Sequence, residues 1–347
     1  MVDNPYTLVF GKEPAQMISR LSQASDIIDQ FTRPHPSQQV YMITGVRGSG
    51  KTVFMSDIAN RLSENSNWIV VELNPNRDLL NSLAARLANT RGLAKVFQSA
   101  KINLSFLGFG VEMSGADPIT DIEVALERML EALRKEGRRV LVSIDEASNS
   151  EAMRVFASSF QMLIRNDSPL YLLMTGLYEN IYELQNEKNL TFLYRAPKVE
   201  LKPLNLTSVA SHYQSTFPIS KEQAIEMARL TRGYPFAFQV LGYFTWEVGG
   251  NFDAILDDYR QYLEDYVYEK IWSSLSAGDR QAAHAIAASR SGKVSEVRTV
   301  LNMDSNHFTP YRTRLIRKGL LNGDRHGYLQ FTLPLFEDYV KMKYQEW

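Results

Sequence analysis

The sequence predicts an α/β fold in three layers, in which a parallel sheet is covered by helices, with a helical region and a small C-terminal domain behind it. Three observations carry this prediction. A glycine-rich turn, Gly45–Thr52, stands between an apolar run and an amphipathic segment. A second apolar run, Arg139–Ile144, ends in the carboxylates Asp145 and Glu146. Beyond residue 271, three short amphipathic segments precede a turn and a strand-like run, as helices precede a β-hairpin in small domains.

The length and composition suit a multidomain globular protein. A chain of 347 residues exceeds one comfortable core, and we expect a core over 1–202, a helical lid over 203–270 and a C-terminal domain over 271–347. Hydrophobic residues make up 44% and charged residues 22%, with no apolar stretch of membrane-spanning length and no signal-peptide pattern. The complete absence of cysteine excludes disulfides and thiolate chemistry. We therefore expect a cytoplasmic protein without a membrane partner.

The turn Gly45–Thr52 fits the phosphate-loop pattern G-x-x-x-x-G-K-[ST], and both of its flanks are those that the motif requires. Strand-like residues 39–43 precede it, and apolar residues at helical spacing follow it. Such a turn aims successive backbone N–H groups and the positive end of a helix dipole at one point, where a polyphosphate can bind. The residues expected to contact the nucleotide are Gly45, Val46, Arg47, Gly48, Ser49, Gly50, Lys51, Thr52 and Val53.

Two residues of this motif have further roles. Lys51 is expected to reach the β- and γ-phosphates, and the Thr52 hydroxyl to ligate Mg²⁺. No Asn/Thr-Lys-x-Asp element of the kind that reads guanine stands in a suitable place, so ATP is favoured over GTP. The chain is thus predicted to bind ATP and Mg²⁺.

The second half of the site is expected at the ends of the strands that follow. Asp145 is predicted to hold Mg²⁺, and Glu146 to polarise the attacking water. The next strand, 169–176, ends in Thr175, which either positions that water or is an ordinary strand-end residue. Arg195, before a strand at 198–201, either answers charge on the γ-phosphate, in its own chain or across a subunit interface, or is a surface residue.

Between these strands lie two other predicted elements. Helical spacing indicates a helix from about Asp117, whose carboxylate would cap it, to Lys135. Residues at about 100–115 alternate between apolar and polar around Gly108–Gly110, which predicts a β-hairpin insertion.

At this point the chain resembles AAA+ and STAND phosphate-loop ATPases, and among them the archaeal-ATPase and origin-recognition-initiator-like proteins. The segments that carry the resemblance are Asn4–Gly11, Gly45–Thr52, Ile144–Glu146, Thr175–Gly176 and Thr231–Leu241. It covers about the first 245 residues, and the tail fits the same plan. In that family a lid helix covers the nucleotide, so the resemblance implies that Pro235 lies against the base or sugar. AAA+ motors often place an arginine after this proline. Phe236 stands there instead, which implies a slow nucleotide switch rather than a ring motor.

The C-terminal segments predict a winged helix. Helices are expected over 277–288, 294–301 and 305–320, followed by a turn at 322–323 and a strand at 328–332. Residues 273–347 carry eleven Lys/Arg against seven Asp/Glu, a balance of +4. The candidate contacts to double-stranded DNA are Arg312, Arg314, Arg317, Lys318 and Arg325.

Three functions therefore remain open from the sequence. The first is an ATP-hydrolysing switch that couples its nucleotide state to DNA binding. The alternative is a nucleotide-gated scaffold with slow or no turnover, whose winged helix docks a protein partner. The third is a replication-initiator-like protein that loads onto DNA and assembles into homo-oligomers.

Overall fold

The computed structural model describes residues 3–9, 17–18, 20–100, 102, 121–289 and 291–345. Its contacts divide the chain into two compact units. We call residues 20–44 and 51–200 the sheet unit, and residues 1–19, 45–50 and 201–347 the lid–tail unit. The three-domain division drawn from the sequence stays a prediction. The predicted hairpin at 100–115 lies, except for residues 100 and 102, outside the described residues.

The sheet unit is built on five parallel strands, as predicted. The strands are β1 (Val40–Thr44), β2 (Trp68–Leu73), β3 (Arg139–Ile144), β4 (Leu170–Gly176) and β5 (Lys198–Glu200). Their order in the sheet is β2-β3-β4-β1-β5, and every neighbouring pair is parallel. Since all carboxyl ends of parallel strands lie along one edge, the ends of β1, β3 and β4 are brought together there.

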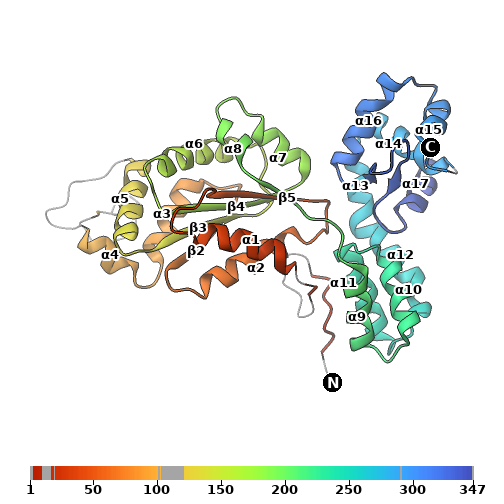
Figure 1. Ribbon diagram of the computed structural model, residues 1–347, viewed down its shortest axis with the longest axis horizontal. Helices are drawn as coiled ribbons and strands as arrows, with labels where there is room; N and C mark the ends of the chain where they lie inside the picture. Colours follow the sequence, from red (N-terminus) through yellow and green to blue (C-terminus); the bar gives the residue numbers. More distant parts are fainter. Residues whose placement is uncertain are drawn as a thin grey trace. The chain divides into compact units, whose positions relative to one another are not determined.

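Helices cover both faces of this sheet (Figure 1). On one side lie α1 (Leu21–Thr32) and α2 (Lys51–Ser63). The opposite core joins Val140, Val142 and Ile144 of β3 to buried residues of the other helices. Those helices are α3 (Leu79–Asn89), α4 (Leu93–Ser99), α5 (Ile122–Lys135), α6 (Glu151–Arg165), α7 (Tyr178–Gln185) and α8 (Thr191–Arg195). The alternation of strand residues between two helical layers gives the predicted three-layer core.

The start of α5 differs from the prediction. This helix begins at Ile122 behind Asp121, whose carboxylate accepts from the backbone N–H groups of Glu123 and Val124. The expected cap, Asp117, lies outside the described residues. A second acid with the same capping chemistry, four residues later, fills the role.

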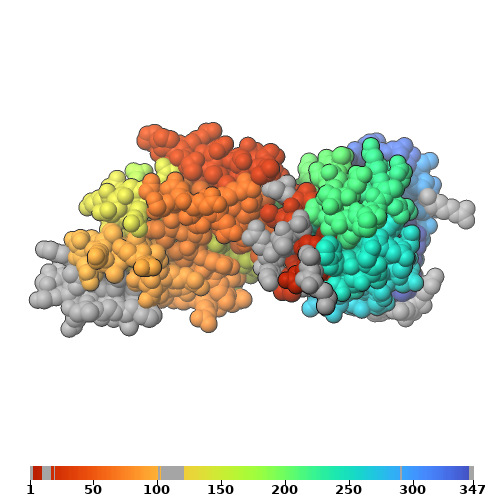
Figure 2. Space-filling view, turned by 90° about the horizontal axis from the view of Figure 1, so that it is seen from below, coloured from red at the N-terminus to blue at the C-terminus, as the bar shows by residue number. Residues whose placement is uncertain are grey.

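The lid–tail unit begins with the helical lid. Its helices are α9 (Leu206–Thr216), α10 (Lys221–Thr231), α11 (Pro235–Glu247), the 3₁₀ turn η2 (Phe252–Ile255), α12 (Leu256–Leu263), the π-helical η3 (Glu264–Tyr268) and α13 (Glu269–Ser274). Figure 2 shows the lid helices, in green and cyan, as one continuous surface. Pro235 opens α11 at a first-turn position, where its missing N–H has no partner to lose.

The tail has the predicted winged-helix plan of three helices and a hairpin. The elements are α14 (Ala277–Ala288), α15 (Val294–Leu301), α16 (Ser305–Arg317), β6 (Leu321–Asn322), β7 (Gln330–Phe331) and α17 (Phe336–Gln345). The strands β6 and β7 pair antiparallel as the wing. The prediction missed α17, which buries Phe336, Tyr339 and Val340.

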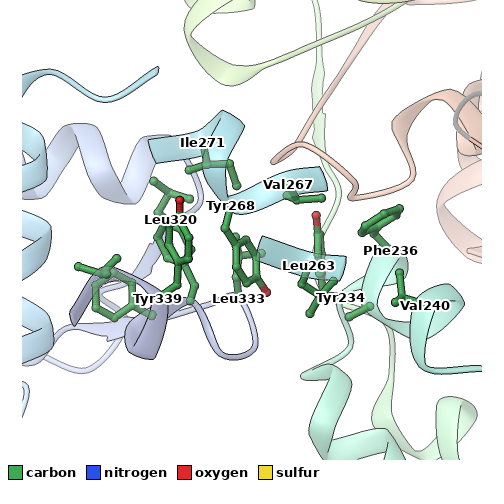
Figure 3. Close-up of a cluster of buried hydrophobic side chains, with 14 of the residues drawn as sticks. Tyr234, Phe236, Val240, Leu263, Val267, Tyr268, Ile271, Leu320, Leu333 and Tyr339 are labelled. Carbon is green, nitrogen blue, oxygen red and sulfur yellow. The ribbon is translucent and has the colours of Figure 1, made fainter. Parts of the chain in front are cut away.

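One hydrophobic core runs from the lid into the tail (Figure 3). Phe236 and Val240 of α11 lie near Leu263 and Val267, and Tyr268 continues the cluster toward Leu333 and Tyr339 of the tail. Such continuous burial makes the lid and the winged helix a single packed body. Among the helices of the described residues, none is long and apolar enough to cross a bilayer.

Candidate nucleotide site

The motif Gly45–Thr52 has the backbone of a phosphate loop. It follows β1 and runs directly into α2, which begins at Lys51. Gly48 has φ +75° and Gly50 φ +84°, in the left-handed region that favours glycine. Lys51, Thr52 and Val53 form the first turn of α2 and are half-buried. The sequence therefore folds locally as the motif requires, from strand to turn to helix.

Thr52 and Asp145 meet within the sheet unit. The Thr52 hydroxyl donates to Asp145 Oδ2 over 2.7 Å. The hydroxyl comes from the first turn of α2, and the carboxylate from the residue after β3. The predicted magnesium ligands are thus adjacent, although 93 positions separate them in the chain.

Thr175 holds the other oxygen of the same carboxylate. This residue is fully buried near the end of β4, and its hydroxyl donates to Asp145 Oδ1. The Asp145 Oδ1 atom also accepts from the backbone N–H of Glu146 at 3.0 Å. The two predicted alternatives for Thr175, a water-positioning residue or an ordinary strand-end residue, stay open, and the structure adds the contact of its hydroxyl with Asp145.

Glu146 occupies a turn with an unusual backbone. Its φ is +54°, which L-residues with a Cβ seldom adopt, and its side chain is exposed. The following residue, Ala147, is buried, and its N–H donates to the Thr175 carbonyl at 2.8 Å. This link to the end of β4 holds the strained turn in place.

Arg195 is the remaining candidate of the sheet unit, and its role stays a prediction. It is the last residue of α8 and is exposed. Within the described residues, the hydrogen bonds that join Thr52, Asp145 and Thr175 do not include Arg195.

In the lid–tail unit, the loop is held by the start of the lid helix. The Tyr234 hydroxyl donates to the Arg47 carbonyl at 2.6 Å, and the Phe236 N–H donates to the Gly48 carbonyl at 3.2 Å. Pro235 is close as well, because a Cβ built on Gly50 would lie 3.8 Å from Pro235 Cβ. Sequence reasoning selected Pro235 and missed Tyr234. The signal was present, since an aromatic residue between Gly233 and Pro235 is placed by the same turn.

The basic residues of the tail are engaged to different degrees. Arg314 forms a bidentate pair with Asp279, with Nη2 at 2.8 Å and Nε at 3.0 Å from Oδ1. Arg312 packs toward the wing turn, since a Cβ on Gly323 would lie 3.5 Å from its Nη2. Burial lowers the pKa of Lys318. Arg317 and Arg325 are exposed, and the Arg325 guanidinium lies 3.9 Å from the centre of the Tyr328 ring.

The partner of Arg314, Asp279, is a buried acid. Its carboxylate is almost fully buried, at 4% exposed, so it requires a charged partner. The Ser276 hydroxyl adds a hydrogen bond to Asp279 Oδ2 at 2.8 Å. Arg314 therefore stabilises the packing of α16 on α14 through this ion pair.

Comparison with known proteins agrees with this geometry. Residues 32–191 match the family described as "ATPase domain predominantly from Archaea", and residues 265–340 match a "Domain of unknown function (DUF8462)". No protein of curated function matches the sequence closely enough to count as a relative. The predicted resemblance to archaeal ATPases is thus confirmed for the core.

Two solved structures share the fold over nearly the whole chain. A Walker-type ATPase of Pyrococcus abyssi has a TM-score of 0.67 at 15% identity, covering 94% of this chain and 96% of its own. The ORC2 protein of Aeropyrum pernix, solved as ADPNP–ADP complexes, has a TM-score of 0.64 at 14% identity, covering 97% and 96%. At such identities the likeness establishes the fold. Residues 32–191 therefore match a family of ATPase domains, and the chain as a whole shares the fold of these two solved structures.

Proposed function

We propose that this protein binds ATP with Mg²⁺ at the segment Gly45–Thr52 and hydrolyses it slowly, as a switch. The observation that supports this most directly is the contact of the Thr52 hydroxyl with Asp145 at 2.7 Å. This contact joins Thr52, the last residue of the phosphate-loop motif, to Asp145, the acid that directly follows β3.

The donor set suits Mg²⁺. A hydroxyl and a carboxylate are the hard oxygen ligands that Mg²⁺ prefers, with coordination distances of about 2.1 Å. Two oxygens on adjacent corners of such an octahedron lie about 3 Å apart, close to the observed Thr52–Asp145 distance of 2.7 Å. When bound, the ion would neutralise charge on the phosphates. Thr175, whose hydroxyl donates to Asp145, would orient the carboxylate that holds the Mg²⁺ ion.

The phosphate loop also offers an unused donor. Ser49 is 3% exposed, and its hydroxyl has no hydrogen-bond partner among the described residues. A buried hydroxyl without a partner costs free energy, and a phosphate oxygen would satisfy it. Lys51, at the start of α2, would supply the charge that pairs with the terminal phosphates.

Glu146 is the proposed general base, directly after the magnesium-binding acid. Its exposed side chain is open to water, as a residue that activates water must be. Arg195, exposed at the end of α8, would answer charge on the γ-phosphate, either in its own chain or from a neighbouring subunit.

Slow turnover and switching are favoured by Phe236. This residue is 9% exposed and packs in the lid core, and its side chain carries no charge for the γ-phosphate. A lid without a charged residue at this position cannot stabilise the charge that develops on the γ-phosphate. Such a lid suits a protein that changes conformation with its bound nucleotide better than one that hydrolyses ATP rapidly.

A direct test is MgATP binding and phosphate release by the wild type and by Lys51→Ala and Glu146→Gln. Lys51→Ala is expected to abolish tight binding. Glu146→Gln is expected to keep binding and to lower kcat by roughly 10²–10⁴-fold, the usual contribution of general acid–base catalysis. Tight ATP binding by Lys51→Ala would contradict the site.

We further propose that the tail binds double-stranded DNA through phosphate contacts. Arg317 lies in the last turn of α16 and Arg325 on the wing, the two parts of a winged helix that meet duplex DNA. Arg314 is left out of this proposal because its guanidinium pairs with Asp279. Phosphate contacts make affinity fall with salt.

The DNA proposal is tested by titrating duplex DNA with the ATP-bound, ADP-bound and nucleotide-free protein at low salt. Arg317→Ala with Arg325→Ala should weaken binding and reduce the slope of log affinity against log salt by about 2, one per phosphate contact. The control is Glu296→Ala, a substitution at an exposed position of α15, which should leave the fold of the domain intact and should not weaken DNA binding. No DNA binding by the wild type would instead support the scaffold that docks a protein.

A further inference from the structure

We propose that Tyr234 is a positioning residue of the nucleotide site, which fixes the Arg47–Gly48 peptide in the orientation that phosphate binding requires. This inference rests on the proposed ATP site, and it assigns a role that the motif itself does not contain. The contact lies within the lid–tail unit, which includes residues 45–50 and the lid.

The hydroxyl of Tyr234 makes a lasting hydrogen bond. It donates to the Arg47 carbonyl at 2.6 Å, and the residue is 3% exposed. Burial raises the pKa of this phenol far above its ordinary value of 10, so the group stays protonated at every working pH. The bond therefore persists as a donor contact to the loop.

The bond fixes a peptide plane. In a trans peptide the C=O and the following N–H point in opposite directions. With the Arg47 carbonyl held by Tyr234, the Gly48 N–H points away from the lid. The next peptide plane, between Gly48 and Ser49, is held at both of its polar groups. The Gly48 carbonyl accepts from the Phe236 N–H at 3.2 Å, and the Ser49 N–H donates to the Val46 carbonyl at 3.2 Å. The lid thus sets two successive loop peptides.

The Tyr234 ring sets the shape of the loop as well. A Cβ built on Gly48 would lie 2.2 Å from Tyr234 Oη and 2.9 Å from Cζ. The glycine is therefore required for its φ of +75° and for the space that the phenol fills. The Tyr234 ring therefore packs directly against the backbone of Gly48, in the space that a side chain at this position would need.

Tyr234 is itself rigidly placed. Its N–H donates to the Thr231 carbonyl at 2.8 Å, and the Gly233 carbonyl accepts from Leu204 at 2.7 Å. Gly233 has φ +72°, and a Cβ there would lie 2.4 Å from the Leu204 carbonyl oxygen. The turn before the lid helix is therefore fixed by packing, and it delivers the phenol to the loop.

The same turn is tied to the wing of the tail. Arg232 Nη1 donates to the Phe331 carbonyl at 2.9 Å and to the Leu333 carbonyl at 3.4 Å. Since Arg232 and Tyr234 are two residues apart, a shift of the phosphate loop on nucleotide binding would act on the wing through one short segment.

The test compares Tyr234→Phe with Tyr213→Phe. Tyr213 is another buried lid tyrosine, whose hydroxyl donates to the Phe238 carbonyl at 2.8 Å, away from the loop. Each variant loses one buried hydrogen bond and keeps its ring. Both should lower the unfolding midpoint, whereas only Tyr234→Phe should raise the Kd for MgATP, by about fivefold, as expected for one net hydrogen bond.

Calorimetric titration of MgATP separates the outcomes. An unchanged Kd for Tyr234→Phe would overturn the positioning role, and a lower Kd would overturn it too, because the contact would then hold the loop against binding. A wild type that fails to bind MgATP would refute the proposed function itself.

The link to the wing has its own variant. Arg232→Ala removes the anchor on the wing carbonyls and leaves the Tyr234 hydroxyl in place. We expect its Kd for MgATP to rise by a smaller factor than that of Tyr234→Phe, with partial recovery in Arg232→Lys. An unchanged Kd for Arg232→Ala would exclude transmission through this segment.

Discussion

Gly48→Ala tests the packing of the phosphate loop against the lid most sharply, because the structure allows its effect to be divided into two parts. The added Cβ would meet Tyr234 Oη at 2.2 Å and Phe236 Cβ at 3.0 Å, in a backbone with φ +75°. The left-handed conformation costs alanine about 1–2 kcal/mol. Overpacking against a buried ring adds about 1–3 kcal/mol. We therefore expect a loss of about 2–5 kcal/mol in unfolding free energy.

A second glycine serves as the matched control. Gly137 has φ +67°, and a Cβ there would meet nothing within 4 Å. Gly137→Ala should thus lose only the conformational part, about 1–2 kcal/mol.

The assay is urea unfolding followed by tryptophan fluorescence, with MgATP titration beside it. Equal losses of stability in the two variants would refute the steric part of the argument. In a Tyr234→Ala background the phenol is gone, and the effect of Gly48→Ala should fall toward that of Gly137→Ala. If Gly48→Ala lowers the unfolding free energy by the same amount in the Tyr234→Ala background, the added methyl group does not clash with the Tyr234 ring.

Other predictions follow from groups outside the phosphate loop. Arg314→Met should destabilise the tail by about 3 kcal/mol, because it leaves the buried Asp279 carboxylate unpaired, and Asp279→Asn should recover part of that loss in thermal unfolding. Burial lowers the pKa of His212 in the folded protein, so on acidification the unfolded chain binds a proton at this histidine more readily than the folded one. The contribution of His212 to the free energy of unfolding is therefore retained above about pH 6.5 and lost as the pH falls below it. His212→Phe should therefore reduce the fall in unfolding temperature between pH 7 and pH 5, and an identical pH profile would exclude this histidine. Glu146→Asn should keep or raise thermal stability while lowering kcat, since asparagine tolerates φ +54° better; a clear loss of stability would show that the backbone there is not strained.

Much of the fold was predictable because local patterns agree with tertiary structure. The strand β2 and the helices α14 and α15 match their predicted bounds, since the periodicity of their apolar residues marks them clearly. The missed helix α17 follows Pro334 and carries Phe336, Tyr339 and Val340 at helical spacing. Its short amphipathic pattern at the end of the chain was the available signal.

The site was predictable where a motif fixes both residue type and spacing. Gly45–Thr52 and Asp145 could be found in this way, and the structure joins Thr52 to Asp145. The contact of Thr175 with Asp145 depends on the order of β3 and β4 in the sheet, which no local pattern specifies.

The partners of Tyr234 and Arg314 depend on three-dimensional packing in the same way. Tyr234 contacts the loop over a separation of 187 positions, and Arg314 finds Asp279 on another helix. A basic residue in a sequence gives no indication of whether its charge is already paired, which is why Arg314 was chosen with the DNA contacts.

The central claim is that Thr52 and Asp145 share one magnesium ion beside the nucleotide. It is tested most directly by calorimetric titration of ATP, with and without Mg²⁺, into the wild type, Thr52→Val, Asp145→Asn and the double variant. Mg²⁺ should tighten ATP binding to the wild type by roughly 10–100-fold, and each single variant should lose most of that gain. The double variant should lose little more than either single one. Full retention of the Mg²⁺ effect in both single variants would contradict the claim.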